Sequence, residues 1–389
     1  CNVCQFGKSQ STELLCNSGG VMAGSGFGKS FRVTTFGESH GAALGAVVDG
    51  VPAGISLSEE DIQKFLDRRR PGTSSVTTSR NESDKCRIYS GVFGGLTTGT
   101  PVMVMVENTS QRSQDYDELA IIYRPGHADF GYDSKYGFRD YRGGGRSSGR
   151  ETIGRVIAGA IASKALDMLG IKVEAFTQSI GNVYARELNL EECSQNDIYM
   201  PDNEAALKAV ELIKKAKSDK DSLGGIIGCI ATGVMPGLGE PVFDKLDARL
   251  SAAVMSIGAI KGVEFGAGFH VSTMKGSQNN DSFFVDEDDT GLHIRKKTNM
   301  SGGILGGISD GSPIIINAAV KPTPSIAREQ ETVNAINEEV ELEIKGRHDP
   351  VIVPRAVVVV ESMVAITLFD MVLENMKSKM DNVLKVYKN

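Results

Sequence analysis

The most constraining feature of the sequence is a stretch rich in glycine and arginine, residues 143–150 (GGGRSSGR), that runs directly into a helical pattern. Small and apolar residues recur at helical spacing over residues 151–169, which predicts a helix there. Glycine lets a ligand approach the backbone closely, and the first turn of a helix presents unpaired N–H groups. With its serine and arginine side chains, the stretch predicts an anion-binding loop at the start of a helix.

An alternative interpretation of the same stretch is a flexible loop of the kind that RNA-binding proteins carry. Such loops come as repeated tracts in basic chains, whereas this chain holds a single tract and has a formal net charge of −7. An acidic protein is poorly suited to coat a nucleic acid. The charge therefore favours a small anionic ligand and no nucleic-acid partner.

Short strands and helices alternate along the rest of the chain, without a fixed-period repeat or a proline-rich linker. The pattern predicts one compact α+β domain. Ser58 and Asp61 have the spacing of a capping box, which predicts a helix start at Glu59. The expected strands are 31–35, 43–48, 87–93, 102–106, 225–234 and 314–320, and the further expected helices are 204–217, 244–257 and 361–380.

Apolar stretches such as 102–106 and 356–360 are far shorter than the roughly 20 residues that a membrane span needs. The sequence therefore predicts a soluble protein with no membrane partner. The six cysteines show neither a disulfide framework nor the paired spacing of a metal site. We expect a reducing compartment: the cytoplasm, with a plastid as the open alternative.

Residues 1–21 are polar and without period, and they resemble neither a signal peptide nor a transit peptide. The chain begins with cysteine, whereas Met22 starts a segment typical of a natural N-terminus. We therefore expect residues 1–21 to be a disordered extension without function and residues 22–389 to form the folded domain.

Arginines gather at residues 68–70 and again between residues 139 and 150. One arginine at the end of a helix interacts favourably with the helix dipole, but three in a row exceed that need. At least one of residues 68–70 is therefore expected to face a phosphate or a carboxylate, which guanidinium groups bind through paired hydrogen bonds.

Two of the five histidines, His40 and His127, lie in glycine-containing turns. Histidine titrates near neutral pH, so both are candidates for proton transfer. No histidine pair has the spacing of a metal site, so no metal is expected. The others are His348, in an Arg-His-Asp-Pro segment, and His270 and His293, which we expect to be structural or on the surface.

Residues 300–307 form a second glycine-rich loop, but they lack the preceding strand and the following acidic residue of a dinucleotide-binding fingerprint. Residues 321–325 (KPTPS) close an apolar strand with a lysine, a rigid turn and two hydroxyls. The second segment is equally consistent with a phosphate-binding turn and with a simple end to the strand.

Taken in order, six segments of the chain resemble motifs of the chorismate synthase family. The resemblance extends over about residues 22–370. Gly149 stands where the family usually has alanine, Val358 where proline is common and Ser75 where arginine is common, so that one anion contact is missing or supplied by Arg80. The matching segments are 36–41 with 49–52, 124–129, 145–152, 301–307, 321–325 and 347–350 with 361–363.

The resemblance implies a β-α-β sandwich, a homotetramer and a lyase that makes chorismate from 5-enolpyruvylshikimate 3-phosphate. The implied reaction is a trans-1,4 elimination of phosphate, the last common step of the shikimate pathway to the aromatic amino acids. Reduced FMN (FMNH2) is implied as cofactor without net redox change, reduced by the enzyme's own NADPH-dependent activity or by an external flavin reductase. An open alternative is a different flavin- or phosphate-ester-dependent lyase on the same scaffold.

The resemblance also implies roles for individual residues. His40 would protonate the departing phosphate, His127 would stabilise the charge of the reduced flavin, and Asp349 would assist hydrogen removal near flavin N5. The implied substrate-binding residues are Ser39, Arg69, Arg80, Arg150 and Arg347, together with His40. The implied FMN-binding residues are Arg146, Ser147, Ser148, Gly258, Ala259, Gly306, Gly307, Lys321, Pro322, Thr323, Pro324, Ser325 and Arg347.

Overall fold

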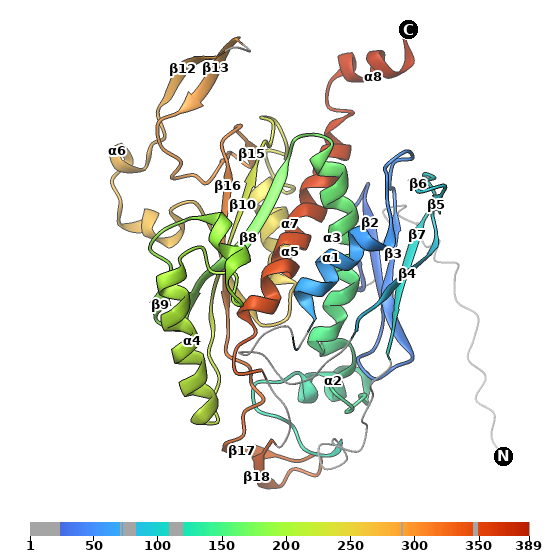
Figure 1. The fold of residues 1–389 in the computed structure, drawn as a ribbon, viewed down its shortest axis with the longest axis vertical. Coiled ribbons are helices and arrows are strands. Elements are labelled where there is room, and N and C mark those ends of the chain that lie inside the picture. The colour runs from blue at the N-terminus through green and yellow to red at the C-terminus, as the bar shows by residue number, and fades with distance from the viewer. Residues whose placement is uncertain are drawn as a thin grey trace, which may run out of the picture.

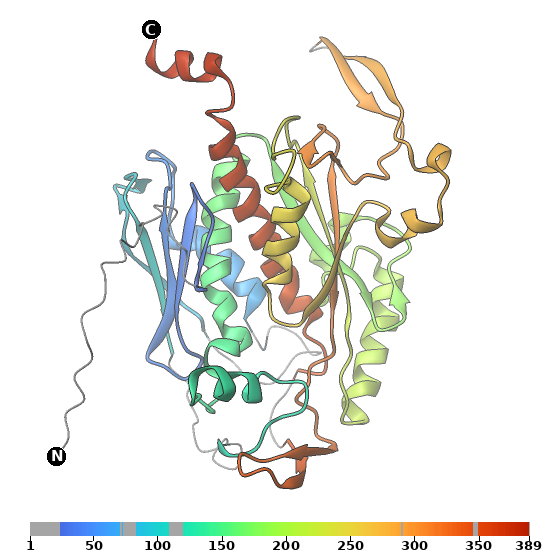
Figure 2. The same cartoon turned by 180° about the vertical axis from the view of Figure 1, so that it is seen from behind.

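The computed structural model describes residues 24–70, 72, 83–108, 120–288, 291–344 and 349–388. A layer of helices lies between two antiparallel β-sheets, so that the chain forms a β-α-β sandwich (Figures 1 and 2). This arrangement confirms the predicted α+β class. The expectations for residues 1–21, Ser75, Arg80, Arg347 and His348 fall outside the described residues.

The first sheet has the strand order β1-β2-β3-β7-β4, with antiparallel neighbours throughout. One face of β7 packs on the helices, because Val102, Val104 and Val106 are fully buried while the residues between them are partly exposed. The bounds are β1 Gly26–Phe27, β2 Arg32–Gly37, β3 Ala43–Asp49, β4 Cys86–Ser90 and β7 Val102–Glu107, with the small hairpin β5 Val92–Phe93 and β6 Leu96–Thr97 alongside.

The second sheet has the order β11-β16-β10-β8-β9 and is also antiparallel. In β16, Ile314, Ile316, Ala318 and Val320 face the core. The bounds are β8 Lys172–Ile180, β9 Val183–Tyr184, β10 Gly225–Thr232, β11 Ile260–Phe265 and β16 Ile314–Val320, and the helix α4, Asn203–Ser218, packs beside β9.

The helical layer consists of α1 Glu59–Arg69, α3 Thr152–Asp167, α5 Leu246–Met255 and α7 Val353–Asn375. Small residues let α3 approach both of its neighbours. A Cβ at Gly159 would lie 2.2 Å from Ser362 in α7, and a Cβ at Gly154 would lie 2.8 Å from the carbonyl oxygen of Gly45 in β3. The predicted capping box of α1 is present, with Ser58 and Asp61 bonded to each other's backbone N–H groups.

Helix α7 corrects two expectations from the sequence. It begins at Val353 and ends at Asn375, so the apolar run 356–360 and the expected helix 361–380 are one element. The sequence also showed no apolar stretch as long as a membrane span, whereas α7 as a whole is long and apolar enough to cross a membrane. However, 83% of its most apolar segment is buried inside the protein. The polar residues Glu361 and Asp370 break up the apolar run, and both are buried with hydrogen-bond partners.

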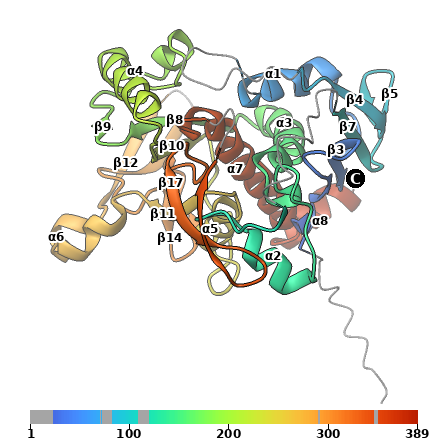
Figure 3. The ribbon, with the colours of Figure 1, turned by 90° about the horizontal axis from the view of Figure 1, so that it is seen from below.

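The two ends of the sandwich differ. At the lower end in Figure 1, α2 and the hairpin β17–β18 lie close to the start of α3, and Figure 3 views this end directly. At the upper end, the hairpin β12–β13 and the C-terminal α8 extend away from the body. The bounds are α2 Asp129–Tyr136, α6 Gly276–Asn279, α8 Met380–Tyr387, β12 Phe283–Asp288, β13 Gly291–Lys296, β14 Ile304–Leu305, β15 Ile308–Ser309, β17 Glu329–Val333 and β18 Glu339–Glu343.

Candidate active site

A cavity of about 1330 Å³ opens at the lower end of the sandwich, between the start of α3, the helix α2 and the loops after α5 and β16. Among the described residues, ten arginine and lysine side chains line it, against four acidic ones. Since the chain as a whole is acidic, this concentration of positive charge marks the cavity as a site for anions.

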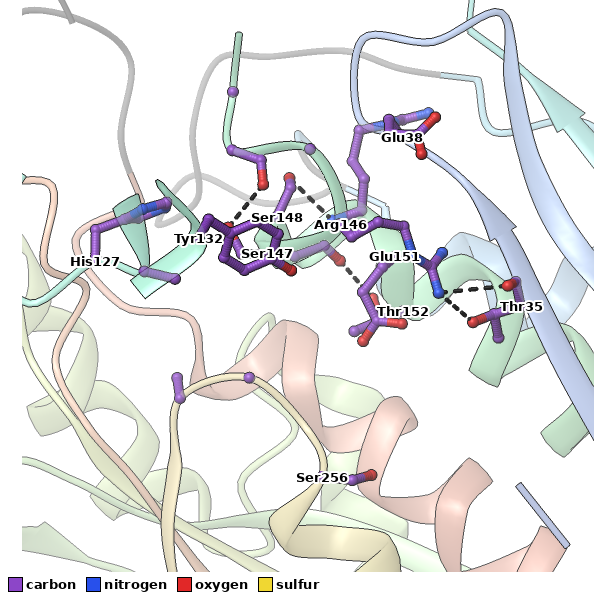
Figure 4. Close-up of a pocket in the computed structure, with 18 of the residues that line it drawn as sticks. Thr35, Glu38, His127, Tyr132, Arg146, Ser147, Ser148, Glu151, Thr152 and Ser256 are labelled. Atoms are coloured by element: carbon purple, nitrogen blue, oxygen red, sulfur yellow. Dashed lines mark hydrogen bonds between the residues drawn. The ribbon is translucent and has the colours of Figure 1, made fainter. Parts of the chain in front are cut away.

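The predicted anion-binding loop forms one wall of this cavity. It folds into two short 3-10 turns, Gly145–Ser147 and Gly149–Glu151, before α3 begins at Thr152. Arg146 reaches across the wall, and its Nη2 donates to Thr35 Oγ1 at 2.6 Å (Figure 4). Among the described residues, Arg146 has no carboxylate within 4 Å, so its charge is available to a ligand.

Two adjacent glycines of the loop give space to the two candidate histidines. A Cβ at Gly143 would lie 2.3 Å from His40 Cε1, and one at Gly144 would lie 3.0 Å from His127 Cε1. Both glycines have positive φ, +66° and +86°, which side-chain-bearing residues rarely adopt. The loop therefore brings together two histidines that are far apart in the sequence.

His40 is buried beneath the loop, and Ser39 lies beside it. Ser39 Oγ is 3.2 Å from His40 Nδ1 and donates to the carbonyl oxygen of Arg142 at 3.4 Å. Neither Ser39 nor His40 lines the cavity directly, although Gly41 and Glu38 do.

His127 lines the cavity and contacts a buried carboxylate. Its Nδ1 lies 2.8 Å from Asp129 Oδ1, and Asp129 also accepts from Arg124 Nε at 2.7 Å and Nη2 at 2.8 Å. Burial alone would raise the pKa of Asp129, but the hydrogen bonds from Arg124 and His127 outweigh it and hold that pKa well below its usual range. Asp129 is therefore ionised at neutral pH.

A second buried carboxylate, Asp84, joins two of the predicted substrate-binding arginines. Its oxygens lie 3.0 Å from Arg69 Nη2 and 3.1 Å from Arg150 Nη1. Arg150 lines the cavity and donates to Asn108 Oδ1 at 2.7 Å. Arg69 is fully buried behind the wall and not in the cavity lining, and burial lowers its pKa to about 10 against the opposing effect of Asp84.

The opposite wall comes from the loops 256–259 and 321–325. Figure 4 shows Ser256 across the cavity from the glycine-rich loop. Lys321 Nζ donates to the carbonyl oxygen of Gly126 at 2.6 Å, and burial together with the nearby charge of Lys261 lowers its pKa. The Thr323 hydroxyl is buried and has no hydrogen-bond partner within the described part of the chain.

Most of the residues predicted for the cofactor lie together on these two walls. Arg146, Ser147 and Ser148 line one of them. Gly306 and Gly307 do not: they form the turn between β14 and β15, where Gly307 lies against Lys245. On the opposite wall the cavity is lined by Gly258, Ala259, Lys321, Thr323, Pro324 and Ser325, and Pro322 is outside the lining.

Asp349 lines the cavity just before α7 and forms an ion pair with Arg355, which lies in the first turns of that helix. Arg355 in turn donates from Nε to the carbonyl oxygen of Arg69 at 3.1 Å.

Several contributors to the site were missed by sequence reasoning. Asp84 and Asp129 are buried carboxylates whose partners are known only from the fold. Tyr132 extends from α2 into the cavity near Ser147 (Figure 4). Asp129 could have been noticed, because it lies two residues after His127 in the same turn. Across the described residues, no group of three His, Cys, Asp or Glu side chains could hold a metal ion.

Comparison with known proteins identifies the family of this chain. A family model described as chorismate synthase matches residues 31–373. The chain belongs to the chorismate synthase family. The chorismate synthases of Agathobacter rectalis and Lachnoclostridium phytofermentans are 58% and 56% identical to it, over 94% of this chain and 100% of each relative. That of Methanocella arvoryzae is 53% identical over 90% of this chain and 95% of the relative.

A solved structure titled "Crystal Structure of Chorismate Synthase" has the same fold, with a TM-score of 0.72 and 32% identity over 93% of this chain and 97% of the other. As a chorismate synthase, the chain is a lyase that removes phosphate from 5-enolpyruvylshikimate 3-phosphate, a step of the shikimate pathway. The family requires a reduced flavin for this reaction.

Proposed function

We propose that the elimination takes place in the cavity at the lower end of the sandwich, with 5-enolpyruvylshikimate 3-phosphate and reduced FMN bound next to each other. The excess of arginine and lysine over acidic side chains in the cavity lining is the observation that carries this proposal. Substrate and cofactor are both polyanions, so an acidic protein must concentrate positive charge to hold them together.

The substrate phosphate and carboxylates bind on the side of the cavity formed by the glycine-rich loop. Arg150 faces the cavity there and is fixed by Asp84 and Asn108. Ser39 and His40 lie beneath Gly143 on the same side. Arg69 supports Arg150 through Asp84, and Arg80 and Arg347 complete the set of proposed substrate ligands.

The wall formed by the loops 256–259 and 321–325, opposite the glycine-rich loop, fits the phosphate-bearing cofactor. Among the described residues, Lys261 and Lys321 have no carboxylate within 4 Å, and the buried hydroxyl of Thr323 has no hydrogen-bond partner. A Cβ at Gly258 would have no atom within 4 Å, so the backbone there is open to a ligand. We propose that this wall holds FMN, together with Arg146, Ser147 and Ser148 of the facing loop.

Three residues perform the proton and hydrogen steps. His40 donates a proton to the departing phosphate as the carbon–oxygen bond at C3 breaks, which requires the phosphate to reach it past Gly143, because His40 lies outside the cavity lining. When bound, the reduced flavin supplies electron density that favours this departure. His127 binds the polar edge of the flavin, and Asp349, held by its ion pair with Arg355, assists removal of the C6 hydrogen. The products are chorismate and inorganic phosphate.

We propose a cytoplasmic homotetramer. The support for assembly is the set of exposed apolar side chains on the β12–β13 hairpin, among them Val285, Leu292 and Ile294. Light scattering on the purified protein gives the mass of the assembly, and a monomer of 41.5 kDa would contradict this part of the proposal.

The reaction is tested by following chorismate formation without oxygen, with photoreduced FMN and purified substrate. Turnover that depends on both supports the proposal, and its absence with a correctly folded protein contradicts it. Repeating the assay in air with NADPH alone decides between reduction of FMN by the enzyme itself and reduction by an external reductase.

A further inference from the structure

We propose that Asp129 is a positioning residue for His127: its carboxylate holds the imidazole with the proton on Nδ1, so that Nε2 is the acceptor presented to the cavity. The inference rests on the proposed role of His127 at the cofactor. The motif that contains both residues predicted a reactive histidine, but sequence reasoning assigned no role to the aspartate.

The contacts around Asp129 leave its carboxylate ionised and fixed. Its side chain is 3% exposed, and Arg124 donates to both of its oxygens from Nε, Nη2 and the backbone N–H. A further cation, Arg139, approaches Oδ1 to 3.6 Å. The carboxylate can therefore only accept hydrogen bonds, and it cannot rotate away from His127 without losing those from Arg124.

The short contact to His127 then determines which ring nitrogen carries the proton. A bare Nδ1 would direct its lone pair at Asp129 Oδ1 from 2.8 Å, whereas a protonated Nδ1 donates to it. Arg124 Nη2 carries two hydrogens: it donates one to Asp129 Oδ1, and it lies 3.0 Å from the same His127 nitrogen, so a bare Nδ1 could accept the other. The carboxylate contact is the shorter of the two, and its negative charge favours a proton on Nδ1.

The other edge of the imidazole is held by the glycine-rich loop. A Cβ at Gly144 would lie 3.2 Å from His127 Nε2, so the ring packs directly on the loop backbone, and His127 lines the cavity. With Nδ1 bonded to Asp129, Nε2 can accept a hydrogen bond or a proton from a bound ligand. The resulting imidazolium charge would be balanced by Asp129.

The test uses solid-state NMR of protein labelled with ¹⁵N in the histidine rings, with the His127 signals assigned by their loss in His127→Gln. The wild type should show Nδ1 protonated and Nε2 bare. Asp129→Asn should move the ring toward the opposite tautomer, because the amide can donate to a bare Nδ1. The matched control is Asp133→Asn, which removes the ion pair of the same helix with Arg139 and should leave the ring signals unchanged.

A double-mutant cycle, measured by kcat, provides the second readout. Asp129→Asn should lower kcat by roughly 10²–10⁴-fold, the range of lost general acid–base groups and of a misdirected catalytic histidine. In a His127→Ala background the same change should lower kcat by less than about twofold, because the histidine that Asp129 positions is absent. An equal loss in both backgrounds would show that Asp129 acts only on the fold and would overturn the proposal.

The spectra also separate this inference from the proposed function. If His127→Ala keeps wild-type turnover, the proposed role of His127 fails, while the tautomer measured in Asp129→Asn still tests the positioning. If Asp129→Asn does not fold, the wild-type spectrum is sufficient, because a proton on Nε2 of His127 would overturn the proposal.

Discussion

Gly143 and Gly144 decide how close the two histidines can approach the ligands. Each glycine has a positive φ, and each lies against a different imidazole. A methyl group at either position would strain the backbone and push a histidine out of place. Gly143 and Gly144 are thus required by the histidines as well as by the anion that the loop binds.

Gly144→Ala should lower turnover by at least about tenfold, because displacing a proton-transfer group that contributes about 10²–10⁴-fold removes part of that contribution. The matched control is Gly131→Ala in α2, which should keep wild-type turnover, because Gly131 is outside the cavity lining, a Cβ there would have no atom within 4 Å and its φ is not positive. Steady-state kinetics under anaerobic conditions measure both. Equal activities in the two variants would contradict the steric role of Gly144.

Asp349→Asn should fold and bind both ligands but turn over far more slowly, since the amide cannot take up a proton. Substrate deuterated at C6 should show a larger isotope effect in this variant, because that step becomes more rate-limiting. Arg355→Gln is the matched control: it removes the same ion pair but keeps the carboxylate. If both variants lose the same activity with unchanged isotope effects, Asp349 only stabilises the start of α7.

Among the site residues, sequence reasoning found those that carry recognisable chemistry in turns, such as His40, His127 and Arg150. It could not find Asp84, because the two arginines that Asp84 joins come from different segments and only the fold brings them together. From the residues alone it did not distinguish Arg68 from Arg69, and only the family resemblance singled out Arg69 for the substrate. In the fold, Arg68 pairs with Glu361 in α7 and Arg69 with Asp84, so the expected carboxylate partners are within the protein.

Helices and strands were predicted well where each has one clear periodicity, as in β16 and α4. The error at α7 has a physical cause. A helix buried on all sides carries no polar stripe to define its period, and its polar residues mark bonds to other elements instead. Glu361 accepts from both η-nitrogens of Arg68 in α1 and from the backbone N–H of Ala175 in β8.

Glu361→Gln should destabilise the protein by about 1.5–3 kcal/mol, the contribution of hydrogen bonds to a charged group, because Arg68 is 31% exposed and can still be hydrated. The side chain of Glu361 is 6% exposed, and its bonds join three elements of the sandwich. The control is Glu204→Gln, in an exposed pair with Lys208 on the surface of α4. Thermal unfolding followed by circular dichroism should show a lower Tm for the first variant only. Equal Tm values would contradict the role assigned to Glu361.

The cavity as a whole is assembled from loops at one end of the sandwich, without a preformed dinucleotide fold. We therefore expect oxidised FMN to bind weakly alone and more tightly with substrate, because the substrate would cover one flavin face and complete the surroundings of the flavin. Titrations of FMN fluorescence with and without substrate measure the difference. Equal affinity in both would mean that the flavin site is complete before substrate binds.

The central position of α7 also bears on how the protein is made. Asp370 in this helix accepts from the backbone N–H groups of Lys29, Ser30 and Phe31, which precede it by about 340 residues in the chain. A nascent chain leaving the ribosome therefore has both β-sheets synthesised before the helix that packs between them has emerged. Until translation nears its end, the inner faces of those sheets lack their final partner, and protection by chaperones would matter most during that interval.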